Sequence, residues 1–141
     1  RVHSHVARIV LADALALMDG EKIRDIVTNK ASIENNLAVG RDPADAASGL
    51  FKDLVPEQRK WALDRITHHP RGVFYEPVKL PNFWSQNWKA TVVYCTEAVN
   101  PGRPHQARAA EYLSASWHEI ETGHYPMLST PDRLVELILE G

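Results

Sequence analysis

A stretch near the end of the 141-residue chain decides its fold: Trp117-His118-Glu119-Ile120-Glu121-Thr122-Gly123-His124-Tyr125-Pro126-Met127-Leu128-Ser129-Thr130-Pro131. Residues 117–121 predict a β-strand, Thr-Gly-His predicts a loop, and the Ser-Thr-Pro ending predicts the start of a helix. Open α/β sheets place their chemistry on loops that follow the carboxyl ends of strands. His124 is therefore the first candidate for a functional residue.

Composition and charge narrow the possible functions. The net charge of −2 and the isoelectric point near 6.4 give no electrostatic case for binding nucleic acid or an anionic membrane. No apolar run has the length of a membrane span, and the first residues lack the apolar core of a secretory signal. A single cysteine, Cys95 in an apolar run, fits a reducing compartment and an inert buried thiol. The sequence therefore predicts a cytoplasmic protein.

Three runs predict the strands of one sheet. Residues 6–12 and 90–95 are apolar runs of strand length, which are typical of buried parallel strands. Residues 117–121 alternate instead, which indicates a position near the sheet edge. Helices are predicted at residues 105–115, where His105 is expected on the surface, and at residues 132–140. This order of strands and helices favours an α/β fold with parallel strands joined by helical crossovers.

Two acidic residues stand where predicted strands end. Asp13 follows the run 6–12, and Glu97 follows the run 90–95. Asp13 is either a turn residue that satisfies backbone N–H groups or a carboxylate held in the crevice where a site would lie. Its position alone weighs these two interpretations equally. For Glu97 the alternative to a functional role is a solvated turn carboxylate.

Residues 20–85 separate the first two predicted strands. Helices are expected to begin near Pro43 and Pro56, and Trp61, Leu63 and Ile66 are expected to face inward from the second of them. No strand is predicted between residues 21 and 75. The stretch 72–88 is rich in aromatic residues that either wall an apolar pocket or pack a long connection onto the core. The residues considered for such a pocket are Phe74, Phe83 and Trp84.

The ending Gly123–Leu134 closely resembles that of α/β-hydrolase-fold enzymes, particularly the plant methylesterase and hydroxynitrile-lyase branch and its bacterial esterase relatives. Ala7–Ala14 looks like the sixth strand of that fold, and Val92–Thr96 looks like the seventh. The resemblance covers essentially the whole chain. It implies that residues 1–19 and 86–141 form the C-terminal half of the hydrolase core, with three parallel strands and crossover helices. Residues 20–85 would form a helical cap or lid.

The resemblance also implies a catalytic triad that is incomplete in this chain. His124 matches the catalytic histidine of the family. Many relatives carry the acid after the seventh strand, where Glu97 stands, whereas haloalkane dehalogenases carry it after the sixth, where Asp13 stands; Asp13 is favoured. The Gly-x-Ser-x-Gly motif that holds the nucleophile is absent from these residues. The expected partner is a companion chain or N-terminal segment that carries this motif and pairs with residues 6–12, without which the chain would be poorly soluble.

The function implied is that of an esterase-like serine hydrolase. It would cleave a small carboxylic ester or lactone through an acyl-enzyme, with no metal or organic cofactor. His124 would be the general base and acid, Asp13 or Glu97 would orient it, and the aromatic residues would line an apolar pocket. Two alternatives stay open: a lyase of the hydroxynitrile-lyase kind that uses the same triad, and a non-catalytic chain with the hydrolase fold that serves binding or assembly.

Overall fold

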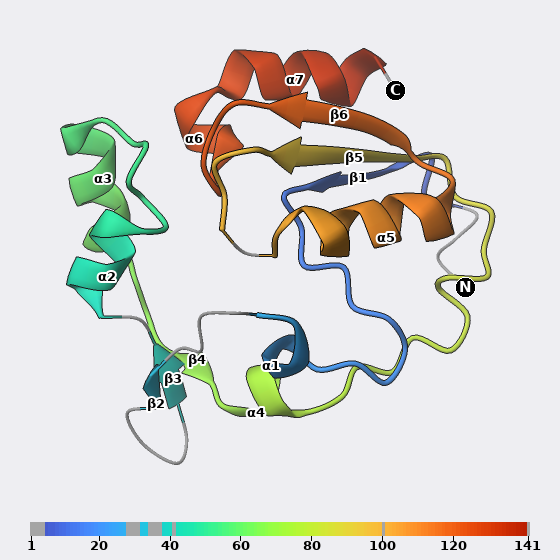
Figure 1. Cartoon of the computed structure of the whole chain (residues 1–141), viewed down its shortest axis with the longest axis horizontal. Coiled ribbons are helices and arrows are strands. Elements are labelled where there is room, and N and C mark those ends of the chain that lie inside the picture. Colours follow the sequence, from blue (N-terminus) through green and yellow to red (C-terminus); the bar gives the residue numbers. More distant parts are fainter. Residues whose placement is uncertain (1–4, 28–31, 34–37, 41, 100, 141) are drawn as a thin grey trace.

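A three-stranded parallel sheet forms the centre of the molecule (Figure 1). The structure, a computed structural model, describes residues 5–27, 32–33, 38–40, 42–99 and 101–140. The strands are β1 (Ile9–Ala12), β5 (Ala90–Cys95) and β6 (Ser116–Ile120), and β5 pairs in parallel with both of the others. The parallel order confirms the α/β fold predicted from the sequence.

The sheet has helices on both of its faces. Figure 1 shows α5 (Arg103–Leu113) and α7 (Pro131–Glu140) on opposite sides of it, with the short α6 (Pro126–Ser129) just before α7. Leu137 of α7 is fully buried and packs with Val93 and Ile120 of the sheet. All six residues of β5 are buried, as expected for a strand covered on both faces and both edges. Within the described ranges, no helix is long and apolar enough to cross a membrane.

The two outer strands differ from β5 in their burial. β6 lies at one edge of the sheet, as its alternating sequence predicts. β1 lies at the other edge of the sheet in the described part of the chain, and its four apolar residues are only partly buried. An apolar strand at a sheet edge leaves both side chains and backbone groups available for pairing.

The insertion between β1 and β5 contains helices and a second small sheet. Its helices are α1 (Ile23–Ile26), α2 (Pro43–Ser48), α3 (Pro56–Leu63) and α4 (Gly72–Tyr75). The prediction that this part holds no strand was wrong, because β2 (Ser32–Ile33), β3 (Ala38–Gly40) and β4 (His69–Pro70) form an antiparallel sheet. Strands of two or three residues are too short to show alternation, and one of them contains a proline.

Helices α2 and α3 begin where the sequence places them. Asp42 Oδ1 accepts a hydrogen bond from the backbone N–H of Ala44 at 2.7 Å, which caps α2. Leu63 and Ile66 pack against the buried cluster of this region as predicted, but Trp61 is 50% exposed. The guanidinium of Arg65 lies 4.5 Å from the Trp61 ring centroid, so the indole is covered by a cation rather than by the core.

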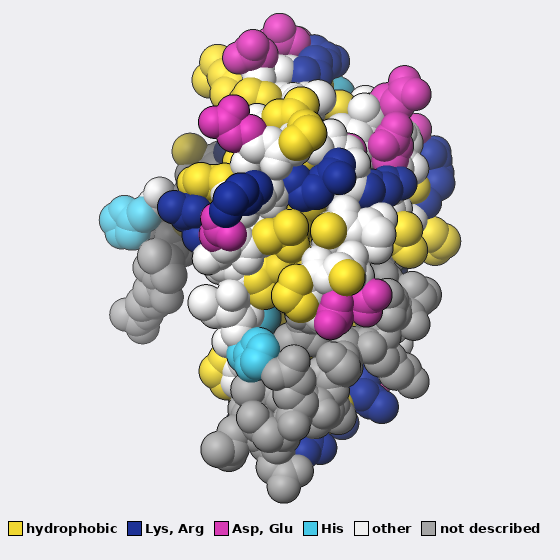
Figure 2. All heavy atoms as spheres, turned by 90° about the vertical axis from the view of Figure 1, so that its left-hand side faces the viewer, with side chains coloured by type: hydrophobic (Ala, Val, Ile, Leu, Met, Phe, Trp, Pro, Cys, Tyr) yellow, Lys and Arg dark blue, Asp and Glu magenta, His cyan; other side chains and the backbone are white. Residues whose placement is uncertain are grey.

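The face on which α2 and α3 lie is chemically mixed. Figure 2 shows basic side chains in a row across this face, with hydrophobic side chains gathered below the row. The arrows of the parallel sheet point toward the same side in Figure 1. The part of the insertion that carries α2 and α3 therefore stands at the carboxyl ends of the strands, where open α/β sheets place their sites, whereas α1 and α4 lie below α5.

Candidate active site

Asp13 lies directly after β1 and is almost fully buried. Its residue exposure is 1%, and its backbone N–H donates to Val93 O at 2.8 Å, which continues the pairing of β1 with β5. Its φ is +46°, in the left-handed region that aspartate tolerates better than branched residues do. This conformation turns the chain sharply at the strand end. The carboxylate is thus fixed at the carboxyl end of β1 rather than left on a free loop.

His124 meets this carboxylate from the loop that follows β6. Its Nδ1 lies 2.6 Å from Asp13 Oδ2, and the His124 side chain is 31% exposed whereas that of Asp13 is 0% exposed. A carboxylate oxygen accepts hydrogen bonds, so Nδ1 donates and Nε2 of the neutral ring is left with its lone pair. The edge of the imidazole packs against the Tyr125 ring at a centroid distance of 4.9 Å. The ring is therefore oriented by one buried acid and one aromatic neighbour.

Gln106 completes the surroundings of the acid. It belongs to the first turn of α5, is 1% exposed, and its Nε2 donates to Asp13 Oδ1. The two oxygens of Asp13 are thus bound by different residues, Gln106 on one and His124 on the other. Sequence reasoning missed Gln106. The available signal was its place in the first turn of the helix after β5, next to the carboxyl ends of the strands.

Glu97 and Cys95 lie at the end of β5 but take no part in this contact. Glu97 is exposed, and its backbone N–H donates to Thr122 O at 3.1 Å. Cys95 is fully buried, and burial raises the pKa of its thiol to about 12, with smaller contributions from the Asp13 and Asp53 carboxylates. Of the two acids considered from the sequence, the structure brings Asp13 to His124, and Cys95 is a buried, protonated thiol.

The three aromatic residues considered for a pocket lie in two separate groups. Phe74 of α4 contacts the ring of His69 at 6.2 Å between centroids. Phe83 and Trp84 contact each other edge to face at 5.1 Å. Trp84 also donates from Nε1 to Leu17 O at 3.0 Å. Trp84, near the end of the insertion, thus bonds to the segment that follows Asp13 and packs on Phe83, whereas Phe74 packs on His69 of β4 within the insertion.

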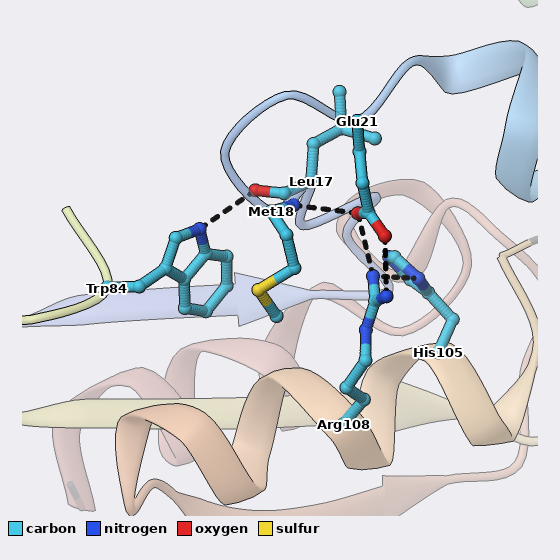
Figure 3. Close-up of polar contacts among 6 residues, drawn as sticks. All are labelled: Leu17, Met18, Glu21, Trp84, His105 and Arg108. Carbon is cyan, nitrogen blue, oxygen red and sulfur yellow. Dashed lines mark hydrogen bonds and ion pairs between the residues drawn. The ribbon is translucent and has the colours of Figure 1, made fainter. Parts of the chain in front are cut away.

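A second polar cluster fastens the segment after β1 to α5 (Figure 3). Arg108 forms two hydrogen bonds with the Glu21 carboxylate, at 2.6 and 2.9 Å, and its Nη2 lies 3.1 Å from His105 Nδ1. The Arg108 guanidinium holds the pKa of Glu21 below its usual value. Burial, and then the Arg108 charge, lowers the pKa of His105. The expectation that His105 lies on the surface was wrong, because this segment covers the side of the first turn of α5 on which His105 lies, while Arg103 and Pro104 stay exposed.

The described residues offer a proton-transfer pair but no nucleophile beside it. Among them, no group of three or more His, Cys, Asp or Glu side chains is arranged to hold a metal ion. The printed sequence contains no Gly-x-Ser-x-Gly motif, and Cys95 is buried and protonated. A histidine held by a buried carboxylate can take a proton from a hydroxyl group and return it.

Comparison with known proteins identifies the fold. No protein-family model and no curated protein matches the sequence. An extracellular α/β-hydrolase from a Paenibacillus species matches with a TM-score of 0.79 and 18% identity, over 99% of this chain and 63% of that one. Polyneuridine aldehyde esterase gives 0.70 and 16%, over 99% and 63%, and a methylesterase from Arabidopsis gives 0.72 and 13%, over 96% and 58%. The chain therefore has part of the α/β-hydrolase fold, as predicted, and it spans less than two thirds of these structures.

Proposed function

We propose that this chain is the histidine- and acid-bearing part of an esterase-like serine hydrolase. The observation that carries the proposal is the 2.6 Å contact between His124 Nδ1 and the fully buried carboxylate of Asp13. Each residue follows a different strand of the parallel sheet, and the other imidazole nitrogen is left to face a substrate. This is the arrangement of base and orienting acid that a serine triad requires.

In the proposed reaction His124 acts as general base and then as general acid. Its Nε2 takes the proton of a serine hydroxyl as the oxygen attacks the carbonyl carbon of an ester, and it returns that proton to the leaving alcohol. Water then attacks the acyl-enzyme with the same assistance. Asp13 keeps the hydrogen on Nδ1 and stabilises the imidazolium that forms. Gln106 holds Asp13 in the orientation that faces His124.

The serine in this proposal belongs to a companion chain or a further segment. The partly buried apolar strand β1 supports this part of the proposal, because its free edge can accept another parallel strand. The solved structures that match are also longer than this chain, which spans 63% of the Paenibacillus hydrolase. We place the Gly-x-Ser-x-Gly turn on the segment that pairs with β1.

The insertion of residues 20–85 is proposed to be the cap of this enzyme. Its α2–α3 part stands before the carboxyl ends of the strands (Figure 1), where a cap would shape the substrate pocket. Phe74, Phe83 and Trp84 are proposed to supply apolar surface to that pocket. The proposed substrate class is a small carboxylic ester or a lactone, and the matched structures named as esterases support the ester.

The test begins with everything that copurifies with the chain from its source. We expect a companion polypeptide that a fluorophosphonate probe labels on serine, together with hydrolysis of p-nitrophenyl esters. His124→Ala should lower kcat by about 10⁴-fold or more, whereas His118→Ala on β6 should leave it unchanged. Release of cyanide or an aldehyde from a cyanohydrin, without ester hydrolysis, would favour the lyase. A companion without a nucleophile at the Gly-x-Ser-x-Gly turn would favour the hypothesis of a non-catalytic chain that serves binding or assembly.

A further inference from the structure

Asp53 links the insertion to the loop that carries His124. It lies between α2 and α3, and its Oδ2 accepts hydrogen bonds from Gly123 N at 2.8 Å and from Thr122 Oγ1 at 3.1 Å. These are the two residues that directly precede His124. A carboxylate that binds two consecutive residues of a loop fixes both the position and the direction of the backbone there.

The close approach of Asp53 depends on the residue at position 123. A Cβ added to Gly123 would lie 2.6 Å from Asp53 Cγ, which is closer than real Cβ atoms come to other heavy atoms. Gly123 is buried and Asp53 is partly buried, with its Oδ1 atom fully buried, so this side of the carboxylate lies against the glycine rather than in solvent. The glycine beside His124 therefore serves contact with Asp53.

The same part of the insertion also holds the loop beyond His124. The Phe51 ring contacts the Tyr125 ring at 5.1 Å between centroids, and Gln58 Nε2 donates to Leu128 O at 3.1 Å. Tyr125 and Leu128 pack against the buried cluster of the insertion. Its buried members are Ala46, Phe51, Leu54 and Ala62. The segment 42–66 thus contacts the chain on both sides of His124.

A network of hydroxyl groups closes the loop on itself. The Thr122 hydroxyl donates to Asp53 and lies 2.5 Å from Ser129 Oγ, whose single hydrogen can be donated to Thr122 Oγ1 or to Tyr125 O at 3.1 Å. Thr122 is 3% exposed, so water competes little for these groups. Asp53 is the member of this network that comes from the insertion, and it anchors the network to α2 and α3.

We propose that Asp53 is a positioning residue for His124, which couples the segment 42–66 of the insertion to the placement of the general base. The contacts alone support the claim that Asp53 holds the loop that carries His124. The claim that this placement matters for ester hydrolysis rests on the proposed function. Asp53 acts through Thr122 and Gly123 and touches no reacting atom. Loss of its carboxylate frees the loop, so that His124 leaves Asp13 more often and meets the serine less often in a productive geometry.

The test compares Asp53→Ala, Asp53→Asn and a control, Asp64→Ala, on the folded chain with whatever copurifies with it. Asp64 is an exposed acid of the same insertion, its side-chain partner among the described residues is the exposed Lys60 at 2.7 Å, and its loss should change little. The first measurement is the proton NMR signal of the hydrogen between His124 Nδ1 and Asp13, and its exchange with solvent. Asp53→Ala should speed that exchange at least tenfold, and Asp64→Ala should leave it unchanged.

The second measurement is the kinetic effect on ester hydrolysis. Asp53→Ala should lower kcat by about 10- to 100-fold with KM within about twofold of its original value, because the loop moves and the pocket stays. Asp53→Asn keeps an oxygen acceptor for Thr122 and Gly123, so it should restore most of kcat. If Asp53 only stabilised the fold, its loss would lower the amount of active enzyme without speeding exchange in the folded fraction.

The outcomes separate this inference from the proposed function. Faster exchange in Asp53→Ala without any ester hydrolysis in the original protein would overturn the hydrolase and keep the positioning role. Ester hydrolysis in the original protein, with exchange and kcat unchanged in Asp53→Ala, would support the hydrolase and overturn the positioning role of Asp53. If Asp53→Ala does not fold, Thr122→Val removes one of its two hydrogen bonds with little change in volume. Unchanged exchange and kcat in folded Thr122→Val would then overturn the inference.

Discussion

The imidazole of His124 and the carboxylate of Asp13 meet at 2.6 Å although 111 positions separate them in the sequence. The contact exists because the carboxyl ends of β1 and β6 lie at the same end of one parallel sheet. β5 stands between these two strands and sets their spacing. The pair is thus a product of the topology, and variants that leave the sheet intact can test it directly.

Asp13→Asn should lower kcat of the assembled hydrolase by about 10⁴-fold, because an amide fails to hold the hydrogen on His124 Nδ1 and to stabilise the imidazolium. Steady-state ester hydrolysis measures this loss, and circular dichroism checks that the fold persists. The matched variant is Glu97→Gln at the exposed acid after β5, which should keep the original kcat. A large loss in Glu97→Gln with normal activity in Asp13→Asn would reverse the assignment of the acid.

Gln106→Leu should destabilise the protein, because it leaves one oxygen of the buried Asp13 carboxylate without its donor. The expected loss in free energy of unfolding is about 1–3 kcal/mol, the range for an unsatisfied buried polar group. Urea unfolding followed by fluorescence measures it. Gln86→Leu, at an exposed position, is the control and should change the free energy by less than about 0.5 kcal/mol. Equal stability of the two variants would contradict the role given to Gln106.

His105 should make the protein less stable as the pH falls below about 6.5. Burial and Arg108 lower the pKa of His105 in the folded state, so the unfolded chain binds a proton at a pH where the folded chain does not. Stability therefore rises with pH through the window between the lowered value and the ordinary value near 6.5. Glu21 adds a loss at lower pH, because its pKa is lowered and its stabilising charge disappears as it is protonated.

His105→Gln should flatten the upper part of this pH dependence and leave the lower part, which belongs to Glu21. Urea unfolding at a series of pH values between about 3 and 8 separates the two effects, because the Glu21 loss lies below its ordinary pKa of 4.5. The control is His118→Gln on β6, which should keep the full dependence. The same slope in His105→Gln as in the original protein would refute the assignment.

The free edge of β1 should make the 141-residue chain associate when it is alone. Its four apolar residues are partly buried, and its outer backbone groups lie at the edge of the sheet. Sedimentation velocity should show species larger than a monomer that grow with concentration, and addition of the companion polypeptide should replace them with one defined complex. A folded monomer that stays monomeric at all concentrations would count against the companion.

The central sheet and part of the candidate site could be predicted from local patterns in the sequence. The apolar runs of β1 and β5 and the alternation of β6 predict a parallel sheet, and the rule that strand ends converge brings Asp13 and His124 together. The residues that hold this pair were not predictable in the same way. Gln106 and Asp53 act through contacts between elements distant in sequence, which no periodicity reports.

In the insertion, the helix starts could be predicted from the sequence, whereas the short strands could not. Its helices α2 and α3 carry local start signals, Asp42-Pro43 and Val55-Pro56, which the structure confirms. Its strands β2 to β4 are two or three residues long, so tertiary pairing rather than sequence pattern defines them. Trp61 has helical spacing for the buried face, but stacking with Arg65 keeps it at the surface.

The contacts of residues 42–66 with the chain on both sides of His124 have a consequence for engineering. In a modular enzyme, a cap can be exchanged to change substrate preference while the core keeps its chemistry. Here, exchange of that segment for one from another hydrolase would also remove Asp53, Phe51 and Gln58, and with them the support of the histidine loop. A graft would have to transplant those three residues as well, because in the proposed enzyme the same piece of chain would both shape the substrate pocket and hold the general base in place.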